Sequence, residues 1–93
     1  MQVDSVDFEP ITEPLPTDWV MRLVIHGSDL SFGATRMVAE MGAQAVQGLM
    51  PTAQAGVVLG FLTSVPQSGD ELRIGYQDLP LISTGITYSP PNA

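Results

Sequence analysis

Two apolar runs constrain the fold of this chain more than any other feature of its sequence. Trp19–Ile25 is a nearly continuous apolar run rich in β-branched and aromatic residues, and Gly56–Thr63 is a second such run. A strand with one face in water alternates apolar and polar residues, so these runs indicate strands that are covered on both faces. Asp70–Gln77 and Ile82–Tyr88 do alternate, and each is expected to keep one face in water.

The segment Ala34–Met50 differs because its apolar residues recur at the spacing of a helix. The residues of this stripe are Ala34, Met37, Val38, Met41, Ala45 and Leu49, with Val46 beside them. Pro51 would end the helix, while Gly42 and Gly48 each weaken it by about 1 kcal/mol relative to Ala. The sequence therefore predicts an α+β fold in one small domain. Its order is arm-β-α-β-β-β, with one helix packed on a mostly antiparallel four-stranded sheet.

The charged residues are distributed unevenly along the chain. The 93 residues contain 10 Asp and Glu against 3 Lys and Arg, which gives a net charge of -7. Residues 1–18 hold five of the acids and no base, whereas residues 19–93 hold five acids and three arginines. We therefore expect an acidic, proline-containing N-terminal arm over 1–18, the α+β domain over 19–88, and an exposed C-terminal tail over 89–93.

The arm contains an alternating segment, Val6–Glu9, that is typical of a short strand, and Pro10 restricts such a strand to the edge of a sheet. We expect the arm to dock on its own domain or on a neighbouring chain. The predicted interaction residues are Val6, Phe8, Ile11, Trp19 and Arg22. Arg22 is the only charge within the most apolar run. It therefore either faces an uncovered side or pairs with an acid such as Asp18 or Glu40, or with one across an interface.

The low content of charged residues indicates that part of the surface is covered by a partner. Charged residues make up 14% of the chain, against about 25% in an average soluble domain. A surface this poor in charge is typical of a domain that another copy or another protein covers. Together with the two runs that are apolar on both faces, it predicts a homo-oligomer. The alternative is a small domain rich in Gly and Thr that simply lacks Lys.

Composition also excludes several classes of protein. Without cysteine there is no disulfide, thiolate zinc site, cysteine nucleophile or iron–sulfur centre. Three arginines are too few for a sequence-independent nucleic-acid binder, which needs clustered cations. No apolar segment approaches the roughly 20 residues of a membrane span, and the acidic N-terminus differs from a signal peptide. We expect a soluble protein of the cytoplasm or of an assembled particle, without direct contact with nucleic acid or membrane.

The segment His26–Gly33 is predicted to be a loop by its Gly, Ser and Asp content. His26, Ser28 and Asp29 are the residue types of a hydrolase triad, but a working triad gathers its members from separate elements. His26 is the single catalytic candidate, and the expectation for it is only that it ends a strand. The loop lacks the Lys of a phosphate loop, and one His with scattered carboxylates lacks the spacing of metal ligands. No cofactor and no metal is expected.

Three functions remain open. The first is a non-catalytic protein-interaction or assembly module, a homo-oligomer or a subunit of a larger particle, whose acidic arm contacts a neighbour. The second is a small α+β enzyme or ligand-binding protein with a pocket between helix and sheet near His26. The third is an acidic inhibitor that binds a basic surface of another macromolecule. The sequence favours the first, because the body is poor in charge and no catalytic constellation is present.

Overall fold

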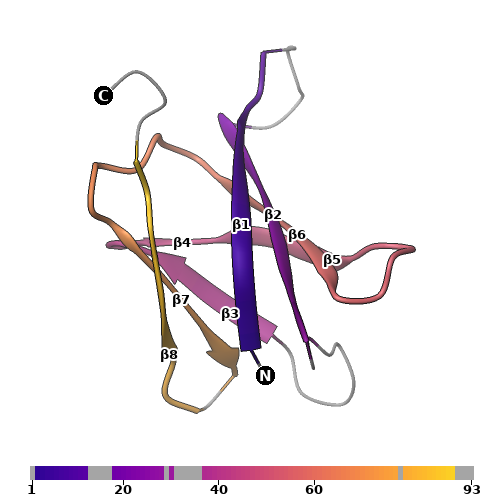
Figure 1. Cartoon of the computed structure of the whole chain (residues 1–93). Coiled ribbons are helices and arrows are strands. Elements are labelled where there is room, and N and C mark those ends of the chain that lie inside the picture. Colours follow the sequence, from indigo (N-terminus) through magenta and orange to yellow (C-terminus); the bar gives the residue numbers. More distant parts are fainter. Residues whose placement is uncertain (1, 13–17, 29, 31–36, 78, 90–93) are drawn as a thin grey trace.

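The computed structural model describes residues 2–12, 18–28, 30, 37–77 and 79–89. These residues form eight strands in two antiparallel four-stranded sheets (Figure 1). The strands are β1 (Gln2–Pro10), β2 (Met21–Ser28), β3 (Met37–Met41), β4 (Gln44–Ala45), β5 (Gln47–Pro51), β6 (Val57–Leu62), β7 (Glu71–Tyr76) and β8 (Ile82–Thr87). Sheet A has the order β1-β2-β6-β5 and sheet B the order β4-β3-β7-β8.

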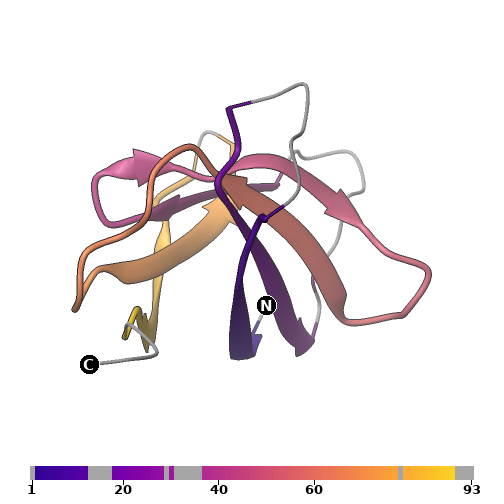
Figure 2. The same cartoon turned by 90° about the horizontal axis from the view of Figure 1, so that it is seen from above.

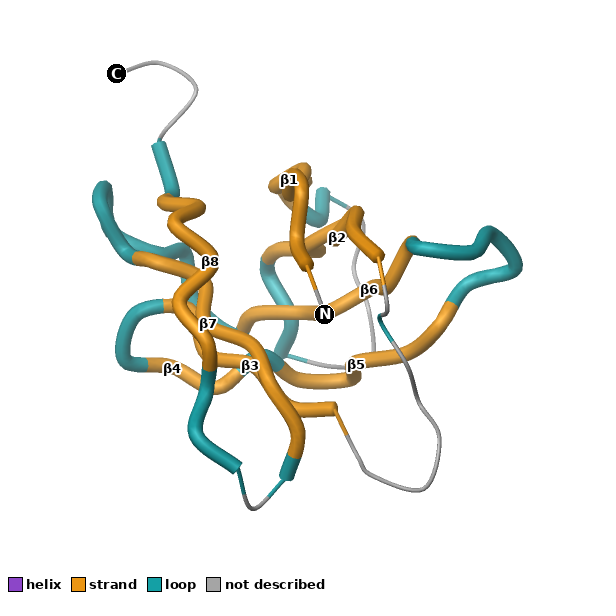
Figure 3. The backbone as a smooth tube through the Cα atoms, turned by 60° about the horizontal axis from the view of Figure 1, so that its bottom comes forward, coloured by secondary structure: helices purple, strands orange, loops and turns teal. Residues whose placement is uncertain are grey.

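The helix predicted over Ala34–Met50 is not present in the described part of that segment, which forms β3, β4 and most of β5 (Figure 3). The α+β prediction is therefore wrong, and the described chain is all β. Met37 and Met41 are four residues apart, a spacing that shares one face of a helix and also one face of a strand. Gly42 and Gly48 have φ of 61° and 62°, a left-handed conformation that a right-handed helix does not contain.

The four strands predicted for the domain are confirmed as β2, β6, β7 and β8, with ends that shift by at most three residues. The loop predicted from His26 is wrong at its start, because β2 continues through Ser28. The extension is held from both sides, since His26 lies opposite Ser5 of β1 and opposite Val57 of β6. Residues 29 and 31–36, which include the first three positions of the predicted helix and, except for Leu30, the rest of that loop, lie outside the described residues.

Half of the acidic N-terminal segment forms β1, an edge strand of sheet A that pairs antiparallel with β2. A register shift between Val3 and Ser5 interrupts the pairing near its start. Val6 and Phe8 face inward and pack against the core. Residues 13–17 of this segment and residues 90–93 of the predicted tail lie outside the described residues.

The core lies between the two sheets and draws on both of them. Its buried residues are Met21, Leu23 and Ile25 of β2, Val58 and Leu62 of β6, Met37, Ala39 and Met41 of β3, and Leu72 and Ile74 of β7, with Val46 and Tyr88. The chain passes from sheet B to sheet A where β4 runs into β5 (Figure 2). The N–H of Val46, between those strands, donates to the carbonyl of Ala39 over 2.9 Å.

On the other side of the molecule β1 and β8 lie next to each other but belong to different sheets. The rings of Phe8 and Tyr88 meet edge to face there, with centroids 5.1 Å apart and planes at 81°. Within the described residues there is no helix, and hence none that is long and apolar enough to cross a membrane.

Candidate interaction surface

The outer face of sheet A carries the side chains that β2 and β6 turn away from the core. Side chains alternate between the faces of a strand. Because Leu23 and Ile25 of β2 are buried, Val24 between them points outward. On β6 the outward residues are Val57, Leu59 and Phe61. Val24 lies directly opposite Leu59, so the two strands present adjoining apolar side chains that are half-buried and lie outside the core.

An aromatic stack lies at one end of this face. The rings of Trp19 and Phe61 are stacked with centroids 4.1 Å apart and planes at 9°, and Trp19 Nε1 donates to Gln47 Oε1 over 3.3 Å. Gly48 makes room for the stack, since a Cβ there would lie 2.9 Å from Trp19 Cη2. Met50, which is 40% exposed, lies opposite Leu59 on β5. Large aromatic side chains fixed in this way are typical anchors of protein interfaces.

These residues together form a surface that we call the apolar strip. Its members are Trp19, Val24, Met50, Val57, Leu59 and Phe61.

Two charge pairs border the apolar strip along β1 and β2. Arg22 Nε donates to Glu9 Oε1 over 2.7 Å, and the two residues lie directly opposite each other in the ladder. His26 Nε2 lies 3.1 Å from Asp7 Oδ2. All four side chains are partly exposed. The border therefore carries both signs of charge, with two acids beside one arginine and one histidine.

The outer face of sheet B is polar by comparison. Arg73 Nη2 donates to Glu40 Oε2 over 2.9 Å across β3 and β7. Glu71 Oε2 accepts from the Ser83 hydroxyl and from the Gly85 N–H. Exposed apolar residues do occur in this half of the molecule, at Leu79 and Ile82. Leu79 lies between β7 and β8, and Ile82 is the first residue of β8, so both lie near one end of sheet B.

The structure separates the five predicted interaction residues. Val6 and Phe8 pack against the core of their own domain, and the N–H of Ile11 donates to the carbonyl of Val20 over 3.0 Å, which prolongs the β1–β2 pairing. Trp19 and Arg22 lie on the outer face of sheet A. The partner of Arg22 is Glu9, an acid that sequence reasoning had not singled out.

Sequence reasoning missed the larger part of the apolar strip. Leu59, Phe61 and Met50 were not predicted as interaction residues. The signal for Leu59 and Phe61 was present, because both lie in the second of the two apolar runs. The sequence does not reveal that this run pairs with β2, nor which of its residues face the core and which face outward.

His26 lies on the outer face of sheet A beside Asp7, and Ser28 ends β2. Asp29, the third member of the candidate triad, lies outside the described residues. The pocket predicted between helix and sheet near His26 lacks its helix in the described part of the chain. Among the residues that the structure describes, there is no group of three or more His, Asp or Glu side chains placed to hold a metal ion.

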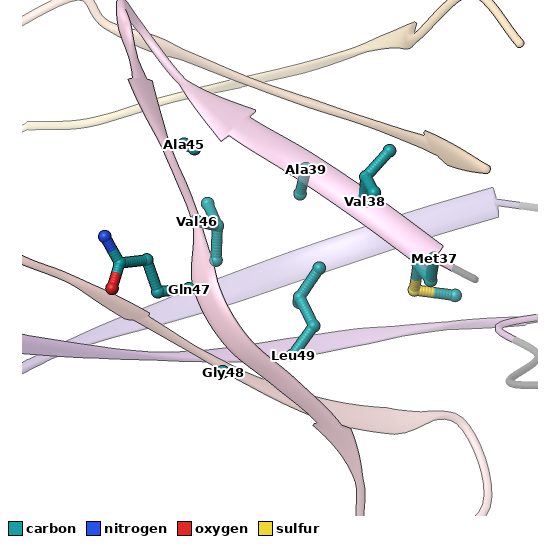
Figure 4. Close-up of a pocket in the computed structure, with 8 residues that line it drawn as sticks. All are labelled: Met37, Val38, Ala39, Ala45, Val46, Gln47, Gly48 and Leu49. Atoms are coloured by element: carbon teal, nitrogen blue, oxygen red, sulfur yellow. The ribbon is translucent and has the colours of Figure 1, made fainter. Parts of the chain in front are cut away.

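The described residues line two open clefts that bear on the site, and His26 lines neither of them. The larger, of about 490 Å³, lies where β3 and β5 diverge after Val46 (Figure 4). Its lining contains Met37, Val38 and Ala39 of β3 and Leu49 of β5, and no charged side chain. The smaller, of about 260 Å³, lies between β1 and the end of β8.

Comparisons of the chain with models of protein families, with curated proteins and with solved structures found no match. The function is therefore inferred from the surfaces of the molecule itself.

Proposed function

We propose that the protein is a non-catalytic assembly module that self-associates by packing the outer face of sheet A against the same face of a second copy. The observation that carries this proposal is the apolar strip, which extends over β2, β6 and β5. Covering apolar surface is favourable by roughly 25 cal/mol per Å². This face gains more from being covered than the polar outer face of sheet B does.

A second copy is the occupant that the border of the strip favours. In a two-fold contact a surface meets itself, and must therefore complement itself. Glu9 and Arg22 offer both signs of charge side by side, so Arg22 of one copy can approach Glu9 of the other. A border of acids alone would repel its own copy.

The size of the face limits the strength of the association. Four strands about 4.8 Å apart, with about six residues of about 3.3 Å each, give a projected area on the order of 400 Å². Two such faces in contact fall at the small end of specific interfaces, where complexes are weak and depend on concentration. The proposed assembly is therefore either a weak free homo-oligomer or a subunit held in a larger particle by further contacts.

The test compares one substitution on each outer face. Leu59→Asp places a charge in the middle of the apolar strip, and Val38→Asp places the same charge on the outer face of sheet B. Sedimentation velocity of the wild type should show an average mass that rises from about 10 μM to about 1 mM. Leu59→Asp should stay monomeric and Val38→Asp should behave as the wild type, with folding of both confirmed by circular dichroism. A wild type that stays monomeric throughout refutes the proposal.

Ionic strength separates self-association from binding to a basic surface. Two copies that each carry a net charge of -7 repel each other, and salt screens that repulsion. Self-association through the apolar strip should therefore hold or strengthen as salt rises from about 0.05 to about 0.5 M. Capture of a basic macromolecule, as by an acidic inhibitor, should weaken over the same range.

A further inference from the structure

Among the described strands, β1 has a neighbour on one side only, so its outer edge has no strand beside it. In an antiparallel ladder the N–H and C=O groups of successive residues point alternately to the two sides of the strand. The N–H of Ile11 donates over 3.0 Å to the carbonyl of Val20, the residue just before β2. The N–H of Gly27 in β2 points to the other side and donates over 2.9 Å to the carbonyl of Gly56, the residue just before β6. This phase directs the backbone groups of Val6 and Phe8 away from β2. In the described part of the chain no strand pairs with them there.

A cleft adjoins this edge. It has a volume of about 260 Å³, and the apolar residues Val6, Phe8, Pro10, Met21 and Tyr88 line it together with Asp7 and Ser89. Tyr88 belongs to the opposite side of the cleft, because its N–H donates to the carbonyl of Asp70 over 2.8 Å and its carbonyl accepts from the Gly69 N–H over 3.0 Å. A free strand edge beside an apolar depression is the arrangement that binds an added strand.

The paired side of β1 shows which kind of neighbour this strand takes. β2 directs Leu23 and Ile25 into the core, and it directs Arg22 outward against Glu9 and His26 outward against Asp7. The pattern is apolar residues inward alternating with basic residues outward. It matches β1, whose inward residues are apolar and whose outward residues are acidic.

We propose that the free edge of β1 binds an extended segment of another protein in which apolar residues alternate with Lys or Arg. Apolar side chains of the segment enter the cleft beside Phe8, its basic side chains lie along Asp7 and Glu9, and its backbone pairs with Val6 and Phe8. A second copy of this chain fits poorly, because the chain has no lysine and its three arginines, at positions 22, 36 and 73, lie too far apart in the sequence to alternate within one segment.

The length of the edge limits the affinity. Pro10 removes a donor at one end, and the register shift between Val3 and Ser5 interrupts the strand at the other. The segment therefore gains its backbone hydrogen bonds mainly from Val6 and Phe8. This site does not depend on the apolar strip, so either can fail without the other.

Three synthetic peptides test the proposal on the full chain. The probe is an acetylated, amidated peptide of seven residues that alternates valine and lysine. One control has the same composition with the lysines in a block, and the other alternates valine and glutamate. In titrations followed by amide NMR, the probe should shift the amides of Val6 and Phe8 and slow their hydrogen exchange. The block peptide should bind about two- to fivefold more weakly, which corresponds to the loss of one exposed ion pair, and the glutamate peptide should not bind.

Two variants complete the experiment. Asp7→Asn should weaken binding of the valine–lysine peptide about two- to fivefold. Asp18→Asn makes the same change of charge away from the cleft and should leave binding unaltered. The proposal is overturned if all three peptides bind alike, if none shifts an amide at about 1 mM, if the shifts fall on the apolar strip, or if Asp18→Asn weakens binding as much as Asp7→Asn.

Discussion

The outer faces of sheets A and B are both built from four antiparallel strands, yet they expose different side chains. The inner faces are equivalent, since Leu23 of sheet A and Leu72 of sheet B are both fully buried. The outer faces diverge at their centres, where sheet A has Leu59 and sheet B has the Glu40–Arg73 pair. A two-layer fold requires only its inner residues to be apolar. The apolar strip is therefore not explained by the fold, and an unexplained apolar face is characteristic of a contact surface.

The largest expected effects test whether the inner faces are equivalent. Leu23→Ala and Leu72→Ala each remove a buried side chain and leave a cavity, and each should lower the free energy of unfolding by about 2–5 kcal/mol. A chain of this length has about 5–14 kcal/mol in total, so urea unfolding should show a large and similar shift for both. A change below about 1 kcal/mol in only one variant would break the equivalence.

Replacing two glycines that are in the left-handed conformation should lower the free energy of unfolding by smaller and unequal amounts. Gly48 has φ of 62° and a Cβ there would lie 2.9 Å from Trp19 Cη2. Gly69 has φ of 91° and nothing within 4 Å of such a Cβ. Both Ala variants should lose about 1–2 kcal/mol for the backbone conformation. Gly48→Ala should lose more and should also change Trp19 fluorescence, because the aromatic stack must move. Equal losses without a change of fluorescence would show that the stack does not need this glycine.

The smallest expected effects concern the two arginine pairs. Arg22→Gln and Arg73→Gln should each change the free energy of unfolding by less than about 1 kcal/mol, because partly exposed ion pairs contribute little. Their effects on self-association should differ. Arg22 borders the apolar strip and its loss should shift sedimentation toward monomer, whereas Arg73 lies on the outer face of sheet B. The comparison between the faces fails if both variants self-associate equally.

Part of this architecture could be predicted from local patterns. The runs that became β2 and β6, and the alternation that became β7 and β8, indicate strands wherever the segments are placed. The segment after Arg36 misled the prediction, because its methionines recur at a spacing common to helix and strand. The glycines at 42 and 48 appeared as a cost to a helix, when they occupy left-handed positions next to a turn and below the Trp19 ring.

The candidate surface was predictable only in part for a related reason. Trp19 and Arg22 could be singled out from one run of sequence. Their neighbours Glu9 and Phe61 come from other strands, and register decides that both lie opposite Arg22. A shift of that register by one residue would turn each strand over and send its outer residues to the core.

The sequence by itself determined that two segments of this chain are apolar on both faces and that the acids gather near its N-terminus. Only the tertiary structure decided that the two segments are neighbours in sheet A, that β1 borders them, and that their outer residues form one strip. The physical reason is the distance along the chain over which each interaction acts. The alternation of side chains is a local property of each strand, whereas pairing depends on backbone hydrogen bonds between segments far apart in the chain and on burial of both inner faces in a shared core.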